Sequence, residues 1–193
     1  MGVRTSPGVC MACIRQPPPV HNLLVAVDYA YPWSALISRY KFGSYPGLAP
    51  LFADLLLSAP GVRIALNGLH AGDLIVPVPL SKERLQTRGF NQSWELAKAL
   101  ARQSGSRAKT DATILLRIKN TQPQTELQRE ARLANVKDAF QPDPLLTHEL
   151  KGRHVVLVDD VMTSGASVFT AAQTLISNGA ARVTGMVFAR TPF

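Results

Sequence analysis

Cysteine is scarce in this sequence: two residues among 193, Cys10 and Cys13. So few cysteines exclude a disulfide framework and are consistent with a reducing compartment. Long apolar runs are also missing, since the longest span about four to six residues before Pro, Asp or Gly interrupts them. We therefore expect no membrane span. Residues 1–16 lack the charged-then-apolar order of a signal peptide, which favours a cytoplasmic protein.

Acidic residues are under-represented: 13 Asp and Glu stand against 21 Lys and Arg, a net charge of +8. Between positions 82 and 137 the imbalance is steeper, with 12 basic residues and 5 acidic ones. Such a segment attracts phosphate groups, either of a nucleotide-like ligand or of nucleic acid. A solvated basic face without a specific partner is the alternative.

The two cysteines form one C-x-x-C pair. A structural zinc ion needs four ligands, so Cys10 and Cys13 supply half of a site. His21 or a second copy of the chain could provide the remainder. The alternative is a pair of reduced thiols that bind no metal.

Proline punctuates the N-terminal part, where residues 17–19 are all Pro. This predicts a cysteine-containing segment with a linker over residues 1–20 and one domain over residues 21–193. The apolar patterns predict strands at 23–27, 73–79, 112–116, 155–158 and 182–189, helices at 32–43, 46–60, 92–103, 126–135 and 167–178, and a turn at 141–144. Because strands and helices alternate, we expect an α/β fold whose mostly parallel central sheet has helices on both faces.

The most informative stretch begins with the apolar strand at 155–158, which leads directly into two carboxylates, Asp159 and Asp160. In open parallel sheets, ligands bind at the carboxyl ends of strands, and carboxylates there can accept hydrogen bonds from vicinal ribose hydroxyls. A run of small and hydroxyl residues follows and opens the next helix: Thr163, Ser164, Gly165, Ala166 and Ser167. Hydroxyl donors, a close backbone approach at the glycine and a helix N-terminus together suit a phosphate monoester. This predicts a site for a sugar phosphate.

Two other interpretations of this stretch exist. In the first, Asp159 has no function beyond ending a strand, and Ser167 is an ordinary N-cap of the next helix. Paired acids also occur in nucleotide hydrolases, but those require a Gly-rich loop ending in Lys-Ser or Lys-Thr, which this sequence lacks.

The stretch from residue 155 to 167 resembles the phosphoribosyl pyrophosphate signature of type I phosphoribosyltransferases. Two further blocks extend the resemblance, one at residues 75–92 with Arg84 and Arg88, and one at 117–140 with Lys119. As an ordered set, the three blocks resemble the ComF/GntX family, which implies a type I phosphoribosyltransferase fold with a small N-terminal hood. Family members usually begin with a double zinc ribbon that contains several cysteine pairs. In this sequence only one such pair, Cys10 and Cys13, is present.

The resemblance also implies roles. Residues 78–88 would face the pyrophosphate, and residues 119–132 would form a mobile loop that closes over the reaction. Arg84, Arg88, Lys119 and Asp160 are then the expected catalytic residues, with Mg²⁺ bound to phosphoribosyl pyrophosphate and a nitrogen nucleophile as acceptor. Relatives are often homodimers.

The resemblance further implies a role in natural competence and DNA uptake. A competing hypothesis is a non-catalytic module on the same fold that senses a nucleotide or handles single-stranded DNA with the DNA-uptake machinery. Phe90 and Trp94 could then stack on bases, although core packing is their more common use.

Overall fold

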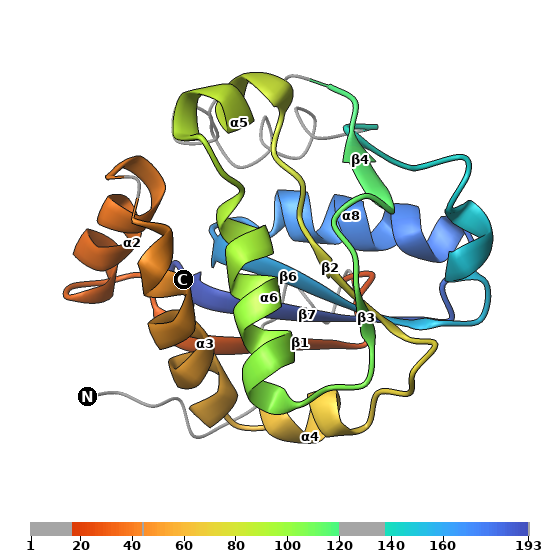
Figure 1. Cartoon of the computed structure of the whole chain (residues 1–193), viewed down its shortest axis with the longest axis horizontal. Helices are drawn as coiled ribbons and strands as arrows, with labels where there is room; N and C mark the ends of the chain where they lie inside the picture. The colour runs from red at the N-terminus through yellow and green to blue at the C-terminus, as the bar shows by residue number, and fades with distance from the viewer. Residues whose placement is uncertain (1–16, 44, 120–137, 193) are drawn as a thin grey trace.

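A five-stranded parallel sheet forms the centre of the molecule (Figure 1). The computed structural model describes residues 17–43, 45–119 and 138–192. Every neighbouring pair in the sheet is parallel. The strands follow in the order β1 (Asn22–Asp28), β7 (Arg182–Arg190), β6 (His154–Met162), β2 (Leu74–Pro77) and β3 (Lys109–Thr110).

The sheet is buried on both faces because its middle strands carry runs of apolar residues. Val155, Val156, Leu157 and Val158 of β6 all have 0% exposed surface. Such continuous apolar strands are typical of parallel sheets covered on both sides. The predicted parallel fold is therefore confirmed, and β6 occupies its middle position.

Helices cover the two faces unequally (Figure 1). One face carries a large apolar core in which Phe52 stacks on Phe188, with ring centroids 4.1 Å apart. The other face packs against one long helix and a small antiparallel sheet. The first layer contains α2 (Trp33–Phe42), η1 (Pro46–Leu48), α3 (Ala49–Ser58), α4 (Val62–Asn67) and α6 (Gln92–Ser104); the second contains β4 (Leu115–Arg117), β5 (Phe140–Pro142), η3 (Thr147–Leu150) and α8 (Ala166–Ser177).

Several sequence predictions were wrong in detail. Residues 82–88, for which no helix was predicted, form the helix α5 (Lys82–Arg88), which the Ser81 side chain caps and Gly89 ends. The strand expected at 112–116 begins only at Leu115, and part of the turn expected at 141–144 pairs with it as β5. Helix α4 was not predicted. The helix expected at 126–135 and both cysteines lie outside the described residues.

None of the helices within the described residues is long and apolar enough to cross a membrane.

Asn91 fixes the start of α6 against the end of β2. Its Oδ1 accepts hydrogen bonds from the backbone N–H groups of Ser93 (3.0 Å) and Trp94 (3.4 Å). Its Nδ2 donates to the backbone oxygen of Val78 at 3.2 Å. The Asn91 side chain therefore joins the end of β2 to the start of α6.

We expect Asn91→Ala to lower stability by about 1–2 kcal/mol, because an N-cap and a second hydrogen bond are lost. For a domain of this size that corresponds to a melting temperature about 2–8 °C lower, measured by circular dichroism. Asn91→Asp is the matched control, since it keeps the cap acceptor and removes only the donor, so its loss should be smaller. Equal melting of Asn91→Ala and the unsubstituted protein would contradict this role.

Candidate functional site

Two carboxylates lie at the carboxyl end of the central strand. The strand predicted to stop at Val158 continues to Met162, so Asp159 and Asp160 are part of β6. Asp160 is buried, with 6% of its surface exposed, and Asp159 is partly buried in register with Val187. The two residues are consecutive, so both carboxylates lie at the same end of the strand, close enough for Asp160 to influence Asp159.

Each carboxylate is held by a different neighbouring element. Asp159 Oδ1 accepts from Ser93 Oγ of α6 at 2.9 Å and from the backbone N–H of Asp160 at 3.0 Å. Asp160 Oδ1 lies 3.1 Å from Lys41 Nζ, near the end of α2. Asp160 Oδ2 is buried and has no hydrogen-bond partner among the described residues. Buried unsatisfied acceptors are rare and costly, so this oxygen is suited to a ligand hydroxyl.

Burial makes the charged form of Asp159 unfavourable. Desolvation, followed by the neighbouring Asp160 carboxylate, raises the pKa of Asp159 to about 7. Lys41 and the Ser93 hydrogen bond act in the opposite direction and lower it. A carboxylate that titrates near neutrality is typical of functional sites.

The loop after β6 opens helix α8, as the sequence predicted. Gly165 is the residue before the helix, with φ of +82°, a left-handed conformation that favours glycine. A Cβ at this position would also overlap the Phe169 ring. Thr163 and Ser164 precede it, and Ser164 Oγ accepts from the Ala166 N–H at 3.4 Å.

Ser167 is the second residue of α8, so its interpretation as the N-cap was wrong. The first-turn N–H groups of this 12-residue helix have no intrahelical partner and carry the positive end of the helix dipole. The helix start is therefore suited to an anion.

Three arginines lie on the β2 side of the carboxylates. Arg84 and Arg88 come from α5, and Arg117 comes from the end of β4. Burial, then Arg84, lowers the pKa of Arg117 to about 10, while Asp159 raises it, so Arg117 is near both groups and remains protonated at neutral pH. Burial, then Arg88, lowers the pKa of Arg84. Partly buried cations that depress one another provide strong binding for an added anion.

Lys119 is placed differently from the predicted arginines. It is exposed, and its Nζ lies 3.7 Å from a carboxylate oxygen of Asp138. Its backbone oxygen accepts from Arg117 Nε at 3.4 Å. The rest of the expected closing loop, residues 120–132, lies outside the described residues.

Sequence reasoning missed three residues of this site as functional candidates. Lys41, Ser93 and Arg117 contact or face the carboxylates from α2, α6 and β4. Arg117 begins the block at residues 117–140, so the resemblance could have marked it. Lys41 and Ser93 reach the carboxylates only through the tertiary fold.

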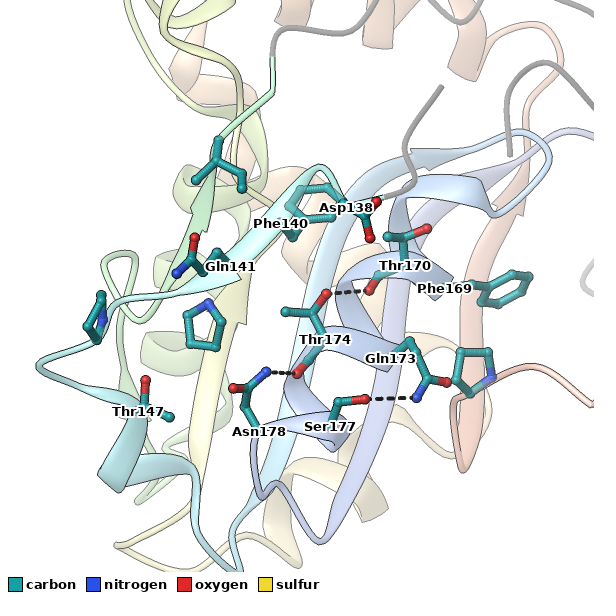
Figure 2. Close-up of a pocket in the computed structure, with 14 residues that line it drawn as sticks. Asp138, Phe140, Gln141, Thr147, Phe169, Thr170, Gln173, Thr174, Ser177 and Asn178 are labelled. Atoms are coloured by element: carbon teal, nitrogen blue, oxygen red, sulfur yellow. Dashed lines mark hydrogen bonds between the residues drawn. The ribbon is translucent and has the colours of Figure 1, made fainter. Parts of the chain in front are cut away.

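A separate cavity of about 990 Å³ lies between α8 and the β5–η3 region (Figure 2). Its polar side chains are largely engaged along α8: Thr174 donates to the Thr170 oxygen and Asn178 to the Thr174 oxygen. Asp138 is the only charged residue among its described lining residues. This cavity is therefore unsuited to an anionic ligand.

The raised pKa of Asp159 makes a prediction about stability. The folded protein holds a proton on this carboxyl more tightly than the unfolded chain does, so stability falls as the pH rises from the ordinary value of 3.8 towards 7. We expect Asp159→Asn to melt higher than the unsubstituted protein at pH 8, by roughly 2–4 °C or more, and at a similar temperature near pH 4. Thermal unfolding across this range measures the difference.

Asp54→Asn, on the exposed side of α3, is the control for the change in net charge. A melting difference between Asp159→Asn and the unsubstituted protein that does not change with pH would contradict the predicted linkage.

The sequence and the structure were compared with protein families and solved structures. Residues 91–192, more than half of the chain, match the family model described as phosphoribosyl transferase domain. In the solved structures, TT1426 from Thermus thermophilus matches with 18% identity and a TM-score of 0.39, covering 76% of this chain and 83% of that one. A likeness at this level adds no argument to the topology described above.

Curated relatives match over most of the chain. DNA utilization protein YhgH of Escherichia coli K12 is 38% identical over 182 residues, covering 94% of this chain and 78% of the relative. Competence protein F of Haemophilus influenzae is 32% identical over 159 residues, covering 82% and 68% respectively. Competence protein ComFC of Bacillus subtilis is 34% identical over 108 residues, covering 56% and 40%. The chain therefore belongs to the ComF family and carries a phosphoribosyltransferase domain.

Proposed function

We propose that this protein binds phosphoribosyl pyrophosphate at the carboxyl ends of β2 and β6. The observation that carries the proposal is the juxtaposition of a buried carboxylate pair, a glycine-led helix start and an arginine cluster. These three features match the hydroxyls, the terminal phosphate and the pyrophosphate of one small ligand.

The ribose and its 5-phosphate occupy the β6 side in this proposal. Asp159 and Asp160 accept hydrogen bonds from the two vicinal hydroxyls, for which Asp160 Oδ2 is available. The 5-phosphate binds residues 163–167, where Thr163, Ser164 and Ser167 supply hydroxyls and the start of α8 supplies N–H groups. A charge-assisted set of this kind binds phosphate without a lysine.

The pyrophosphate lies on the β2 side, against Arg84, Arg88 and Arg117. Mg²⁺ would be held by the pyrophosphate of the substrate and would neutralise part of its charge. Fixed cations at this position stabilise the negative charge that accumulates on the leaving group. Lys119 is exposed and adjacent to Arg117 through its backbone, so it can approach the same anion from the solvent side.

Turnover in this proposal is a displacement at the anomeric carbon. A nitrogen nucleophile forms a bond to that carbon while the bond to the pyrophosphate oxygen breaks and the pyrophosphate leaves. Catalysis is then mainly positioning and electrostatics. Asp160 is our candidate to take the proton of the nucleophile, because its Oδ2 is a buried acceptor without a partner in the described part of the chain.

A second candidate function is handling of single-stranded DNA without turnover. Tyr31, Phe42 and Tyr45 are 86%, 72% and 55% exposed, which is unusual for aromatic side chains. Arg39 lies over the Tyr45 ring at 5.5 Å and Arg88 over the Phe42 ring at 5.1 Å. Exposed rings beside arginines suit stacked bases and a phosphate backbone. Phe90 and Trp94, by contrast, pack partly into the core.

Names of the relatives connect the family with DNA utilization and competence. We propose the corresponding role here, in the use or uptake of DNA. Pyrophosphate release with any of a panel of nitrogen bases supports the enzyme, whereas salt-sensitive binding of single strands without release supports the second candidate.

We expect the double variant Asp159→Asn/Asp160→Asn to bind ribose 5-phosphate at least tenfold more weakly than the unsubstituted protein. Hydrogen bonds to charged acceptors contribute about 1.5–3 kcal/mol each, and 1.4 kcal/mol is a factor of ten. Calorimetry measures the affinity, with Asp54→Asn as the control. An unchanged affinity in the double variant removes the ribose assignment.

Arg117→Met separates the pyrophosphate position from the rest of the site. We expect a loss of about tenfold or more in affinity for phosphoribosyl pyrophosphate with Mg²⁺, and little change for ribose 5-phosphate, because only the former contains a pyrophosphate. Arg102→Gln, on the exposed side of α6, is the control for lost positive charge. Equal losses for both ligands would show that Arg117 acts on the fold of the site instead.

A further inference from the structure

Lys41 connects helix α2 to the carboxylate pair. Its Nζ is 3.1 Å from Asp160 Oδ1, and the two side chains are 20% and 8% exposed. A partly buried ion pair of this kind is screened less by solvent than a surface pair. This lysine belongs neither to residues 163–167 nor to the cluster of Arg84, Arg88 and Arg117.

The ion pair has a direct effect on the geometry of Asp160. Lys41 holds Oδ1 of Asp160, and this leaves Oδ2, which has no hydrogen-bond partner in the described part of the chain, as the oxygen open to a ligand. Asp159 is held in a similar way, since Ser93 and the backbone of Asp160 both donate to its Oδ1. Both side chains are therefore fixed through one oxygen.

Two adjacent carboxylates in a buried position repel each other, and one of them tends to keep its proton. Lys41 from α2 opposes this tendency directly, and Arg117 of β4 faces Asp159 with Arg84 of α5 beside it. Tyr40 of α2 also faces Asp160, but burial and that carboxylate raise the pKa of Tyr40, so the tyrosine stays neutral. Among residues 17–43, 45–119 and 138–192, Lys41 is the cation within ion-pair distance of the pair.

We propose that Lys41 is a positioning residue of the ribose subsite, whose ammonium orients Asp160 and favours the ionised form of Asp159, so that the pair can accept the sugar hydroxyls. A protonated carboxyl group presents a donor where the sugar also presents donors. The proposal rests on the proposed function for the identity of the ligand. The effect of Lys41 on the carboxylates exists in the free protein as well.

The test compares Lys41→Gln and Lys41→Arg with the unsubstituted protein between pH 5.5 and 9. Carbon-13 NMR of the aspartate carboxyls, assigned with Asp159→Asn, follows their titration in the ligand-free protein. Calorimetry with ribose 5-phosphate follows the affinity over the same range. Lys98→Gln removes a lysine whose partner is Glu95 on the same helix and serves as the matched control.

In Lys41→Gln, we expect both the carboxyl titration and the loss of affinity to move upward by about one pH unit or more. The affinity at pH 7 then falls about tenfold and recovers at pH 9, whereas Lys41→Arg retains the original profile. Lys98→Gln should match the unsubstituted protein throughout.

An affinity that drops equally at every pH, with an unmoved carboxyl titration, would overturn the proposal and leave Lys41 a packing role. If the unsubstituted protein binds no ribose 5-phosphate at any pH, the proposed function fails, and the titration in the free protein still decides the role of Lys41. Thermal unfolding establishes that each variant is folded, and Lys41→Arg provides the decisive comparison if Lys41→Gln is not.

Discussion

Parallel pairing between β2 and β6 is the constraint on which the site depends. In register, Pro77 lies beside Val158, so both strands end at the same edge of the sheet. The loop after β2 leads into α5 and its arginines, and the end of β6 carries the carboxylates and leads into α8. An antiparallel arrangement would separate these groups by the length of a strand. Anion-binding and hydroxyl-accepting groups therefore meet because of the sheet.

The carboxylate pair lowers stability, and the surrounding elements compensate for only part of that cost. Burial raises the pKa of Asp159 despite Lys41 and Ser93, so the ionised pair is not fully stabilised in the free protein. An incompletely stabilised charge of this kind is common at functional sites, where a ligand supplies the missing interactions. Asp160 Oδ2, which lacks a hydrogen-bond partner among the residues that the structure describes, is a second unsatisfied group at the same place. Together they distinguish this edge of the sheet from the cavity beside α8, whose polar groups largely bond within the helix.

The fold and half of the site could be predicted from sequence because their signals are local. The apolar run before Asp159 and the small residues up to Ser167 determine a strand, a turn and a helix within one continuous stretch. Prediction failed where structure depends on distant contacts. Residues 82–88 have mixed polarity and no buried side chain, so no apolar periodicity indicated α5. Lys41 and Ser93 also gave no signal, since their role arises only when α2 and α6 pack beside β6.

Helix α2 contributes to two parts of the molecule at once. Through Lys41 it holds Asp160, and through Phe42 it contacts Arg88 of the arginine cluster, whose guanidinium lies 5.1 Å from the ring centroid. These are consecutive residues at the end of one helix, so a shift of α2 would move the contacts to Asp160 and to Arg88 together. The exposed face of Phe42 is also where an aromatic acceptor or a DNA base could stack. Under the proposed function, an acceptor at this ring would contact the same helix end that holds Asp160, so the acceptor and the sugar would share one helix.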